Sequence, residues 1–367
     1  MLFHSIVIVE RWSLQVAEAP REGMFQTGEP ETEEEVASME ILRPPPRELW
    51  WQVAEACDYA TFFQSPLWTE MVCETHHPLK NATVGAILPS GTRLILPLVQ
   101  APAAKGLLRA LQSTWDWSPG GVVADGPVDA RDLAAVYQSL QSRRLGEAVL
   151  NGNPHSPLQD PPHQKGWEVR EEFTQTLPLS GDLDDIIRGY SSAHRRGLKS
   201  AQRAGVNVRK GCTIEDFEAY YQAYQASHDR WNATWGPPHP WELFANCHQT
   251  SLRHPDKLTL WLAELDGTLL SGGIFLYWNR GVVYWHGAGH KEYFRFYPNN
   301  LLHTEVIRDA ISRGLSWYDF NPSAGQEGVA RFKSGFGAGK KTFLRTLYSS
   351  RMLSTIRAFG VWRTKRV

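Results

Sequence analysis

The chain has 367 residues, of which 42% are hydrophobic and 21% are charged, as in an ordinary soluble globular protein. Its length fits two domains better than one, and the formal net charge of −1 excludes a strongly basic or acidic protein, although it can hide a local basic patch. The four scattered cysteines have no CxxC spacing, which excludes a zinc ribbon or a dithiol motif and favours a reducing compartment.

The N-terminal segment is predicted to be neither a membrane anchor nor a folded domain. FHSIVIVERW has too few consecutive apolar residues to span a bilayer, and it lacks the basic start and the cleavage site of a signal peptide. We therefore expect a cytoplasmic protein without a transmembrane segment. Five glutamates fall between Glu29 and Glu35 with few apolar neighbours, which predicts an acidic, flexible segment over residues 1–43.

The next part of the chain reads as an αβ unit over residues 44–160. ELWWQVAEAC has a helical pattern, and Ser65-Pro66 predicts the start of a second helix. ATVGAIL and RLILPLVQ then read as strands joined by a PSG turn, followed by the amphipathic helix RDLAAVYQSLQSRRL and the strand EAVLNG. The Pro-rich stretch NPHSPLQDPPHQKG predicts a connector to a second domain.

Residues 161–350 read as a second α/β unit with a mixed sheet. AHRRGLKSAQRAG and IEDFEAYYQAYQASHDRW are predicted helices on either side of the strand NVRKG. LTLWLAELDGTLLSGGIFLYWNRGVVYWHGAGH reads as three strands joined by DG and NRG turns. The helix NNLLHTEVIRDAISRGL is expected to end at Gly314, before the strand WYDFN. Residues 351–367 form a predicted basic tail.

The stretch RFKSGFGAGKKT has the look of a phosphate-binding loop but fails its pattern. Such a loop requires Gly, four residues and then Gly-Lys-Ser/Thr, so that backbone N–H groups cradle phosphates and a hydroxyl reaches Mg²⁺. Aligned on Gly339 and Lys340, the first glycine position holds Ser334 and the hydroxyl position holds Lys341. The stretch is therefore not a nucleotide-hydrolysing loop.

Several fragments together resemble the Gcn5-related N-acetyltransferase (GNAT) superfamily, and more closely its FemAB branch with the BioF2-like acetyltransferases. They are HRRGLKSAQRAGVNVRKG, SHDRW, LAELDGTLLSGGIF, YPNNLLHTEVIRDAISRGLSWYDFN and RFKSGFG. FQSPLWTEM and LPLVQ resemble the N-terminal domain of the same branch, so the resemblance covers about residues 48–350. It implies an α/β fold of two tandem GNAT-like domains.

The resemblance implies an enzyme that forms an amide by moving an acyl or aminoacyl group onto an amine. GNAT enzymes bind the pyrophosphate of acetyl-CoA on a Gly-rich turn, which should lie here within HKEYFRFYPNNL, between His290 and Leu301. That stretch contains no glycine, and Pro298 removes one N–H donor. Asn299 and Asn300 could cap the following helix and leave N–H groups facing a ligand.

Aminoacyl-tRNA is therefore the favoured donor, with no tightly bound cofactor. The acceptor is an amine of a small molecule, a peptide or a cell-envelope precursor. An acyl-CoA- or carrier-protein-dependent N-acyltransferase is one alternative, and a non-catalytic module that binds a nucleotide-sugar or RNA is another. The sequence does not specify the acyl group, the acceptor or the oligomeric state.

The resemblance also implies a catalytic centre at RFKSGFG, with Lys333 and Phe332 in the family positions. Lys333 would stabilise negative charge as the amine attacks an ester carbonyl, while Phe332 packs the donor's end. A desolvated ammonium aimed at an oxyanion can lower a barrier by ~3 kcal/mol. A solvated loop lysine is the structural alternative. His286, or Asp319 at a strand end, could take a proton from the amine.

Basic residues supply candidate binding groups. From Gly328 to Val367 there are ten Lys or Arg residues and no Asp or Glu, which suits a phosphate backbone. Candidate donor- or phosphate-binding residues are Arg331, Lys340, Lys341, Asn299 and Asn300. Candidate substrate-binding residues are Arg196, Lys199, Arg230 and Tyr318; the resemblance places the helix of Arg196 and Lys199 near the acceptor. His286 and His290 are not expected to bind metal, because Gly287 and Gly289 indicate a strand or turn where this spacing does not converge.

Overall fold

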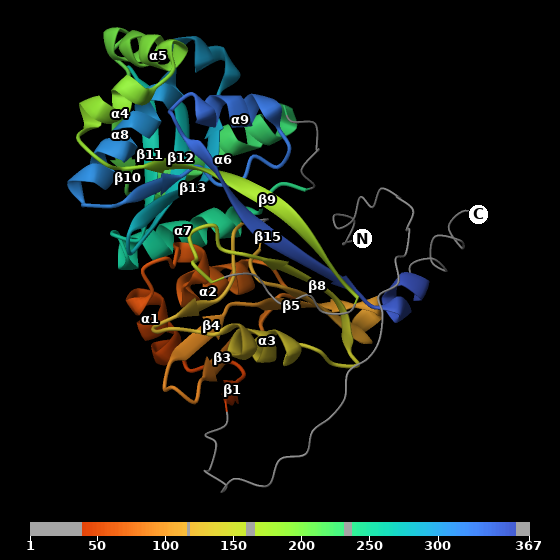
Figure 1. The fold of residues 1–367 in the computed structure, drawn as a ribbon. Coiled ribbons are helices and arrows are strands. Elements are labelled where there is room, and N and C mark those ends of the chain that lie inside the picture. The colour runs from red at the N-terminus through yellow and green to blue at the C-terminus, as the bar shows by residue number, and fades with distance from the viewer. Residues whose placement is uncertain (1–38, 116–117, 159–165, 231–236, 357–367) are drawn as a thin grey trace, which may run out of the picture.

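The computed structural model describes residues 39–115, 118–158, 166–230 and 237–356, which form two lobes built on a shared sheet (Figure 1). The larger sheet has eleven strands and the smaller one, in the N-terminal lobe, has four. The pairs β13–β14 and β6–β8 are parallel, whereas the other pairs within the larger sheet are antiparallel. The predicted mixed α/β class is thus confirmed. None of the helices in these ranges is both long and apolar enough to cross a membrane.

The N-terminal lobe holds the small antiparallel sheet and three helices. In sheet order its strands are β1 (Glu40–Leu42), β3 (Val84–Ile87), β4 (Arg93–Leu96) and β7 (Val123–Ala124), and the helices are α1 (Arg47–Ala56), α2 (Pro66–Thr75) and α3 (Ala130–Gln138). Ser65 precedes Pro66 at the start of α2, as the sequence predicts. Strand β1 falls inside the segment 1–43, because Met39 and Ile41 pack on the apolar cluster around Leu94. Residues 1–38 of that segment lie outside the described ranges.

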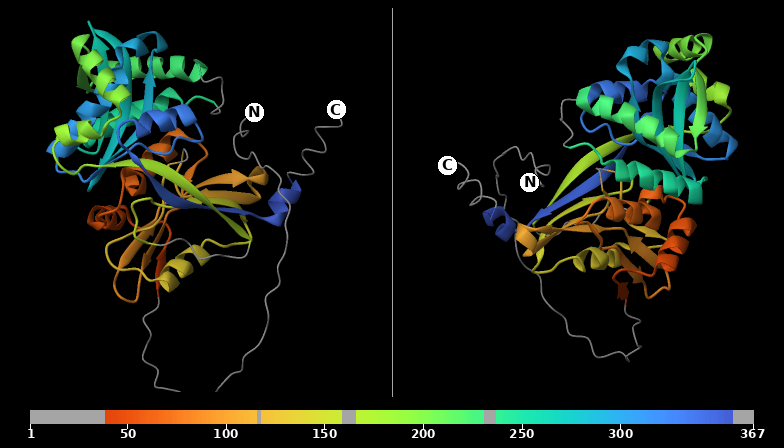
Figure 2. Two further views of the ribbon diagram at one scale, coloured as in Figure 1. Left: turned by 45° about the horizontal axis from the view of Figure 1, so that its top comes forward. Right: turned by 180° about the vertical axis from the view of Figure 1, so that it is seen from behind.

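The eleven-stranded sheet runs through both lobes. In order, its strands are β10 (Asn207–Gly211), β11 (Leu258–Leu265), β12 (Thr268–Trp278), β13 (Gly281–Gly289), β14 (Trp317–Asp319), β9 (Trp167–Pro178), β15 (Gly339–Ser349), β8 (Leu145–Asn151), β6 (Leu108–Gln112), β5 (Val99–Ala103) and β2 (Lys80–Asn81). Strands β9 and β15 are the longest antiparallel ribbon, and they extend from one lobe into the other (Figure 2). Because β15 also pairs with β8, the last strand of the chain completes the sheet of the first lobe.

Helices cover both faces of the C-terminal half of this sheet. Helices α4 (Leu183–Gly189), α5 (Ser192–Arg203) and α8 (Pro298–Ser312) contribute to one apolar cluster, and α6 (Ile214–Arg230) and α7 (Trp241–Arg253) contribute to another. Strand β11 serves both, since Leu260 and Leu262 belong to the α6–α7 cluster while Trp261 and Ala263 belong to the α8 cluster. This alternation is the two-residue period of a strand buried on both faces.

The α6–α7 cluster continues into the N-terminal lobe. It includes Trp50 of α1 and Trp68 of α2, and the rings of Trp68 and Trp285 pack edge to face with centroids 5.1 Å apart. A polar contact reinforces this junction. The turn between β12 and β13 brings the Asn279 side-chain amide to the carbonyls of Ala54 (2.9 Å) and Cys57 (2.7 Å), at the end of α1. Carbonyls at a helix end have no partner within the helix, so Asn279 supplies one.

Replacing Asn279 with alanine should therefore weaken the junction between the lobes. The change removes two part-buried hydrogen bonds, although the Ala54 carbonyl keeps the Trp278 indole and the Cys57 carbonyl keeps the Ala60 N–H as donors. At about 1 kcal/mol for each bond, we expect a loss of about 2 kcal/mol in the free energy of unfolding. Urea unfolding followed by tryptophan fluorescence measures this loss. Asn207→Ala, at an exposed strand end, is the control and should change the free energy by less than about 0.5 kcal/mol. Equal effects of the two substitutions would contradict the assignment of Asn279 to the junction.

Candidate active site

The two parallel strands β13 and β14 separate soon after they pair. Only Gly281–Val283 and Trp317–Asp319 are in register, after which β13 continues to Gly289 and β14 ends. Along the same stretch, Tyr284 lies opposite Phe275 and His286 opposite Ile274, so Trp285 is the extra residue of a β-bulge. Bulges concentrate beside functional sites, and ligands of α/β sheets bind at the carboxyl ends of strands. We call the opening between β13 and β14 the fork.

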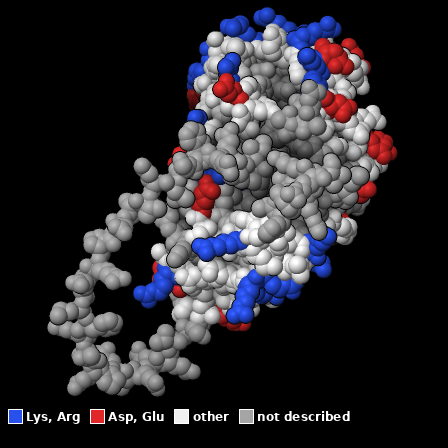
Figure 3. Space-filling view, turned by 90° about the vertical axis from the view of Figure 1, so that its right-hand side faces the viewer, with Lys and Arg blue, Asp and Glu red and all other residues white. Residues whose placement is uncertain are grey.

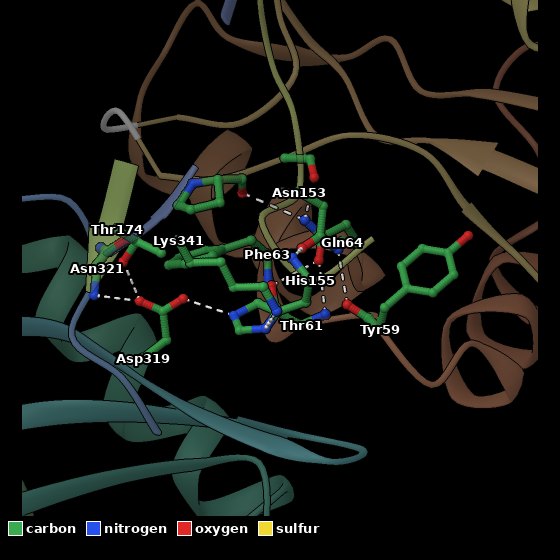
Figure 4. A network of polar contacts seen from close by, with 12 residues as sticks. Tyr59, Thr61, Phe63, Gln64, Asn153, His155, Thr174, Asp319, Asn321 and Lys341 are labelled. Carbon is green, nitrogen blue, oxygen red and sulfur yellow. Dashed lines mark hydrogen bonds and ion pairs between the residues drawn. The ribbon is translucent and has the colours of Figure 1, made fainter. Parts of the chain in front are cut away.

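The carboxylate of Asp319 lies at this fork and is 1% exposed (Figure 4). Its Oδ1 accepts hydrogen bonds from the Asn321 backbone N–H at 2.7 Å and from the Thr174 hydroxyl. Its Oδ2 lies 2.8 Å from Nε2 of His155, a residue of the N-terminal lobe. Both oxygens are thus engaged, and these contacts favour a positioning role for Asp319 over the proton-accepting role considered from the sequence.

His155 is held from two further sides. Its ring stacks on Trp317 with centroids 3.7 Å apart, and its Nδ1 lies 3.3 Å from Nζ of Lys341 on β15. Partial burial lowers the pKa of Lys341, while the negative charge of Asp319 acts in the opposite direction. The chain Lys341–His155–Asp319 therefore joins the connector after β8, the C-terminal ribbon and the end of β14.

Lys333 lies in the last turn of α9 (Glu327–Ser334) and is 4% exposed. Its Nζ donates to the carbonyls of Asn321 at 2.7 Å and Pro322 at 3.1 Å, in the loop that Asp319 anchors. The solvated loop lysine considered from the sequence is therefore wrong. Gly335 and Gly337 come after the helix, so Lys333 itself is helical.

Burial lowers the pKa of Lys333 from its ordinary value of 10.5 to about 7, and the Asp319 carboxylate opposes this shift. Taking an ammonium out of water disfavours its charged form, whereas a nearby anion favours it. Near neutral pH the amine consequently exchanges between its charged and neutral forms. Amines tuned in this way are typical of sites where a proton or a developing charge is handled.

The aromatic surroundings of Lys333 come from α5, α8 and β14. The Phe332 ring lies 5.1 Å from His194 and 5.7 Å from His303. Burial lowers the pKa of His303 to about 3, and the positive charges of Lys333 and His194 act in the same direction, so His303 is neutral. Its Nδ1 bonds the hydroxyl of Tyr318, which is fully buried. Tyr318 is thus a core residue. The prediction that it contacts substrate is wrong, because its side chain is fully buried.

The remaining predicted residues are spread around this centre. His286 lies on the α6–α7 side of β13, where its Nδ1 is 2.6 Å from the hydroxyl of Tyr220. Phe332, in contrast, packs on the α8 side, so the structure does not bring His286 and Phe332 to one face of the sheet. Arg230 ends α6, donates to the Gly289 carbonyl at 3.3 Å and lies 5.5 Å from the centroid of the Phe294 ring.

The predicted phosphate-binding residues are mostly exposed. Arg331 projects from α9, Lys340 lies 4.4 Å from the centroid of the Phe173 ring, and Lys341 lies beside His155. Arg196 and Lys199 are exposed on α5, at the helical spacing that the sequence predicts.

The capping prediction for Asn299 and Asn300 is wrong. Helix α8 begins at Pro298, its cap is Tyr297 in a left-handed conformation (φ 54°), and no side chain caps it. Because Pro298 takes the first helical position, both asparagines fall inside the first turn, and Asn300 is buried.

Four residues of the site were not found from the sequence: His155, Thr174, Trp317 and Asn321. His155 lies in the Pro-rich connector, and its partner Asp319 is 164 residues away. Within the described ranges, no group of three or more His, Cys, Asp or Glu side chains is arranged to hold a metal ion.

The fold and part of the sequence are similar to those of known proteins. Residues 189–334 match the family described as "Acetyltransferase (GNAT) domain". The structure is similar to that of FemX, with a TM-score of 0.63 and 13% identity over 85% of this chain and 98% of that one. It is also similar to L-PGS from Bacillus licheniformis, with a TM-score of 0.53 and 10% identity over 86% and 96% of the two chains.

The sequence of the chain is also similar to that of a known transferase. It is the UDP-N-acetylmuramoylpentapeptide-lysine N(6)-alanyltransferase of Weissella viridescens, which is 25% identical over 138 residues. That match covers 38% of this chain and 39% of the relative's length. The GNAT match over residues 189–334 and the sequence similarity to this transferase thus concern parts of the chain, while the similarity to FemX concerns the fold of nearly the whole of it.

The contact between His155 and Asp319 joins the two lobes and should therefore stabilise the folded chain. We expect His155→Ala and Asp319→Asn each to cost about 2 kcal/mol in the free energy of unfolding, because a buried charged group loses a hydrogen-bond partner. The double variant should cost at least 1 kcal/mol less than the sum. The exposed pair Arg47–Glu70 is the control, with an expected coupling below about 1 kcal/mol. Additive losses for His155 and Asp319 would contradict the coupling.

The lowered pKa of Lys333 makes stability depend on pH in a defined direction. As pH rises from 7 towards 10, the folded chain loses this proton while the unfolded chain keeps it. Wild type should therefore gain stability relative to Lys333→Met, by on the order of 1 kcal/mol per pH unit. Urea unfolding at pH 7 and at pH 9.5 measures the difference. If wild type and Lys333→Met differ in free energy of unfolding by the same amount at both pH values, the pKa of Lys333 is not lowered.

Proposed function

We propose that this chain is an acyltransferase that forms an amide by moving an aminoacyl group from aminoacyl-tRNA onto an amine. The observation that carries the proposal is the buried Lys333 beside the fork, held by two carbonyls and flanked by Phe332. The name of the Weissella viridescens relative, an alanyltransferase that acts on a lysine N(6), is consistent with this class of reaction.

The chemistry needs little beyond orientation and charge stabilisation. The acceptor amine attacks the ester carbonyl, the carbon–oxygen bond to the ribose breaks, and the ribose hydroxyl receives the proton that the amine loses. Lys333 is placed to stabilise the oxyanion that develops on the carbonyl oxygen. Because an ammonium has three N–H groups and two of them donate to Asn321 and Pro322, the third is left for this oxyanion.

The tRNA donor is supported by features of the loop before α8 and by charge. No glycine lies between His290 and Leu301, and bulky Tyr297 occupies the turn where a Gly-rich loop would let backbone approach a pyrophosphate. Exposed Arg331 and Lys340 flank the segment of Lys333 and provide charge for phosphates. An acyl-CoA donor is the competing outcome of the test below.

The test gives the purified chain a pool of candidate amines with either charged total tRNA or a panel of acyl-CoAs, and seeks new amides by mass spectrometry. We expect product only with charged tRNA and its loss after RNase treatment. Product with acyl-CoA alone would overturn the tRNA donor. Lys333→Met should lower turnover by roughly 10²–10³-fold. Lys105→Met, an exposed lysine of the N-terminal lobe, is the matched control and should leave turnover unchanged.

The pH dependence of turnover distinguishes two roles for Lys333. If the ammonium stabilises the oxyanion, turnover should fall as pH rises through about 7, because burial lowers the pKa of Lys333 to that value. A rise in turnover through the same pH, absent in Lys333→Met, would instead assign Lys333 as the base that deprotonates the amine.

A further inference from the structure

The exposed face of helix α5 is basic and lacks compensating acids. Arg196, Lys199 and Arg203 are exposed on this helix, and α5 contains no Asp or Glu. In the part of the chain that the structure describes, none of the three forms an ion pair with a carboxylate. The neighbouring cations Arg209 and Lys210 do form such pairs, with carboxylates of α6, α8 and β11. Lys and Arg side chains gather at the end of the molecule that carries α5 (Figure 3).

Two exposed aromatic rings belong to a segment that contacts α5. Tyr297 is 46% exposed and Phe294 is 41% exposed, and both belong to the segment that joins β13 to α8. The Tyr297 ring lies over Gly197 of α5, where a Cβ would meet Cδ1 of the ring at 2.9 Å. Glycine at this position therefore lets the ring approach the backbone of α5, one residue from Arg196. The guanidinium of Arg230 lies over the Phe294 ring.

One end of the same helix packs against the candidate active site. The backbone N–H of Ser191, the cap of α5, donates to the carbonyl of Gly335 at 2.8 Å. In the first turn of α5, the His194 ring lies 5.1 Å from Phe332 and 4.6 Å from Phe336. The basic face thus begins beside the turn that carries Lys333 and leads away from it.

We propose that the exposed face of α5, with Tyr297 and Phe294, binds the single-stranded 3′ end of the donor tRNA. Arg196, Lys199 and Arg203 contact successive phosphates, and the two rings stack unpaired bases, so that the esterified terminal ribose reaches Lys333. This inference rests on the proposed tRNA-dependent transfer and assigns Arg196 and Lys199 to the donor, rather than to the acceptor as the sequence analysis has it.

The dimensions and the chemistry favour RNA. From Arg196 to Arg203 the helix advances roughly 10 Å at 1.5 Å per residue, which corresponds to about three nucleotide steps of a stacked strand at 3.4 Å rise per nucleotide. Rings interleaved with cations are the usual surface for single-stranded nucleic acid. A membrane-binding helix instead carries large apolar side chains beside its cations. The exposed residues of α5 other than the cations are Ser192, Ala193, Ser200 and Gln202.

The experiment that tests the proposal measures binding of deacylated total tRNA to the full chain at several salt concentrations. We expect the triple variant Arg196→Ala/Lys199→Ala/Arg203→Ala to bind at least tenfold more weakly than wild type. The slope of log K against log salt should fall by about two, at ~0.7 per phosphate contact with a single strand. The control removes the same charge from exposed cations of the N-terminal lobe, in Lys105→Ala/Arg131→Ala/Arg143→Ala, and should bind like wild type.

A second pair of variants separates stacking from charge. Tyr297→Ala and Phe294→Ala should each weaken binding of an RNA hairpin with a single-stranded CCA end by about tenfold, and leave binding of the blunt hairpin unchanged. Equal weakening with both hairpins would overturn the stacking role. Unchanged tRNA binding by the α5 variant would overturn the surface as a whole. If the wild-type protein binds vesicles rich in phosphatidylglycerol but does not bind tRNA, RNA is not the ligand of the α5 surface.

Turnover measured with two donors tests the α5 surface separately from the transfer reaction. The α5 variant should lose amide formation with charged tRNA and retain it with an aminoacyl-adenosine donor, which lacks the polynucleotide. Full turnover of the variant with charged tRNA would overturn the α5 surface while the transfer reaction stands. No turnover of wild type with either donor would overturn the transfer reaction itself.

Discussion

The buried carboxylate of Asp319 is the point through which the two lobes and the candidate catalytic amine are linked. A carboxylate at 1% exposure is costly unless its oxygens are fully hydrogen-bonded. The partners come from separate parts of the chain: His155 from the N-terminal lobe, Thr174 from β9 and the Asn321 N–H from the loop after β14. Satisfying this one charge therefore requires both lobes to be folded and docked.

The same charge sets the properties of Lys333. By binding the Asn321 N–H, Asp319 fixes the loop whose carbonyls, at Asn321 and Pro322, accept from Lys333. Burial lowers the pKa of Lys333 to about 7, and the negative charge of Asp319 limits this lowering. A change at His155 can thus alter the protonation of Lys333 without touching it, because the two residues act through one carboxylate. The docking of the two lobes and the pKa of Lys333 thus both depend on the carboxylate of Asp319.

Local patterns predicted much of the fold, and long-range pairing explains what they missed. Ser65-Pro66, the DG and NRG turns and the amphipathic helices are encoded within a few residues, so the sequence identifies α2, the strands β11–β13 and α8. Strand β15 was missed because its polar start, GKKT, becomes a strand only by pairing with β9 and β8. Lys333 was found through the family motif alone, whereas its burial and its link to His155 depend on contacts that no spacing records.

The cations of this chain also divide by chemistry. Lys333 is a lysine in a desolvated position, and an amine can be tuned to exchange a proton near neutral pH. The exposed face of α5 carries two arginines and one lysine, whose side chains suit phosphates. A net charge of −1 conceals this arrangement, since acids elsewhere offset the basic face. An anionic polymer would be drawn to the basic face of α5, and its reactive end would then lie near the buried amine of Lys333.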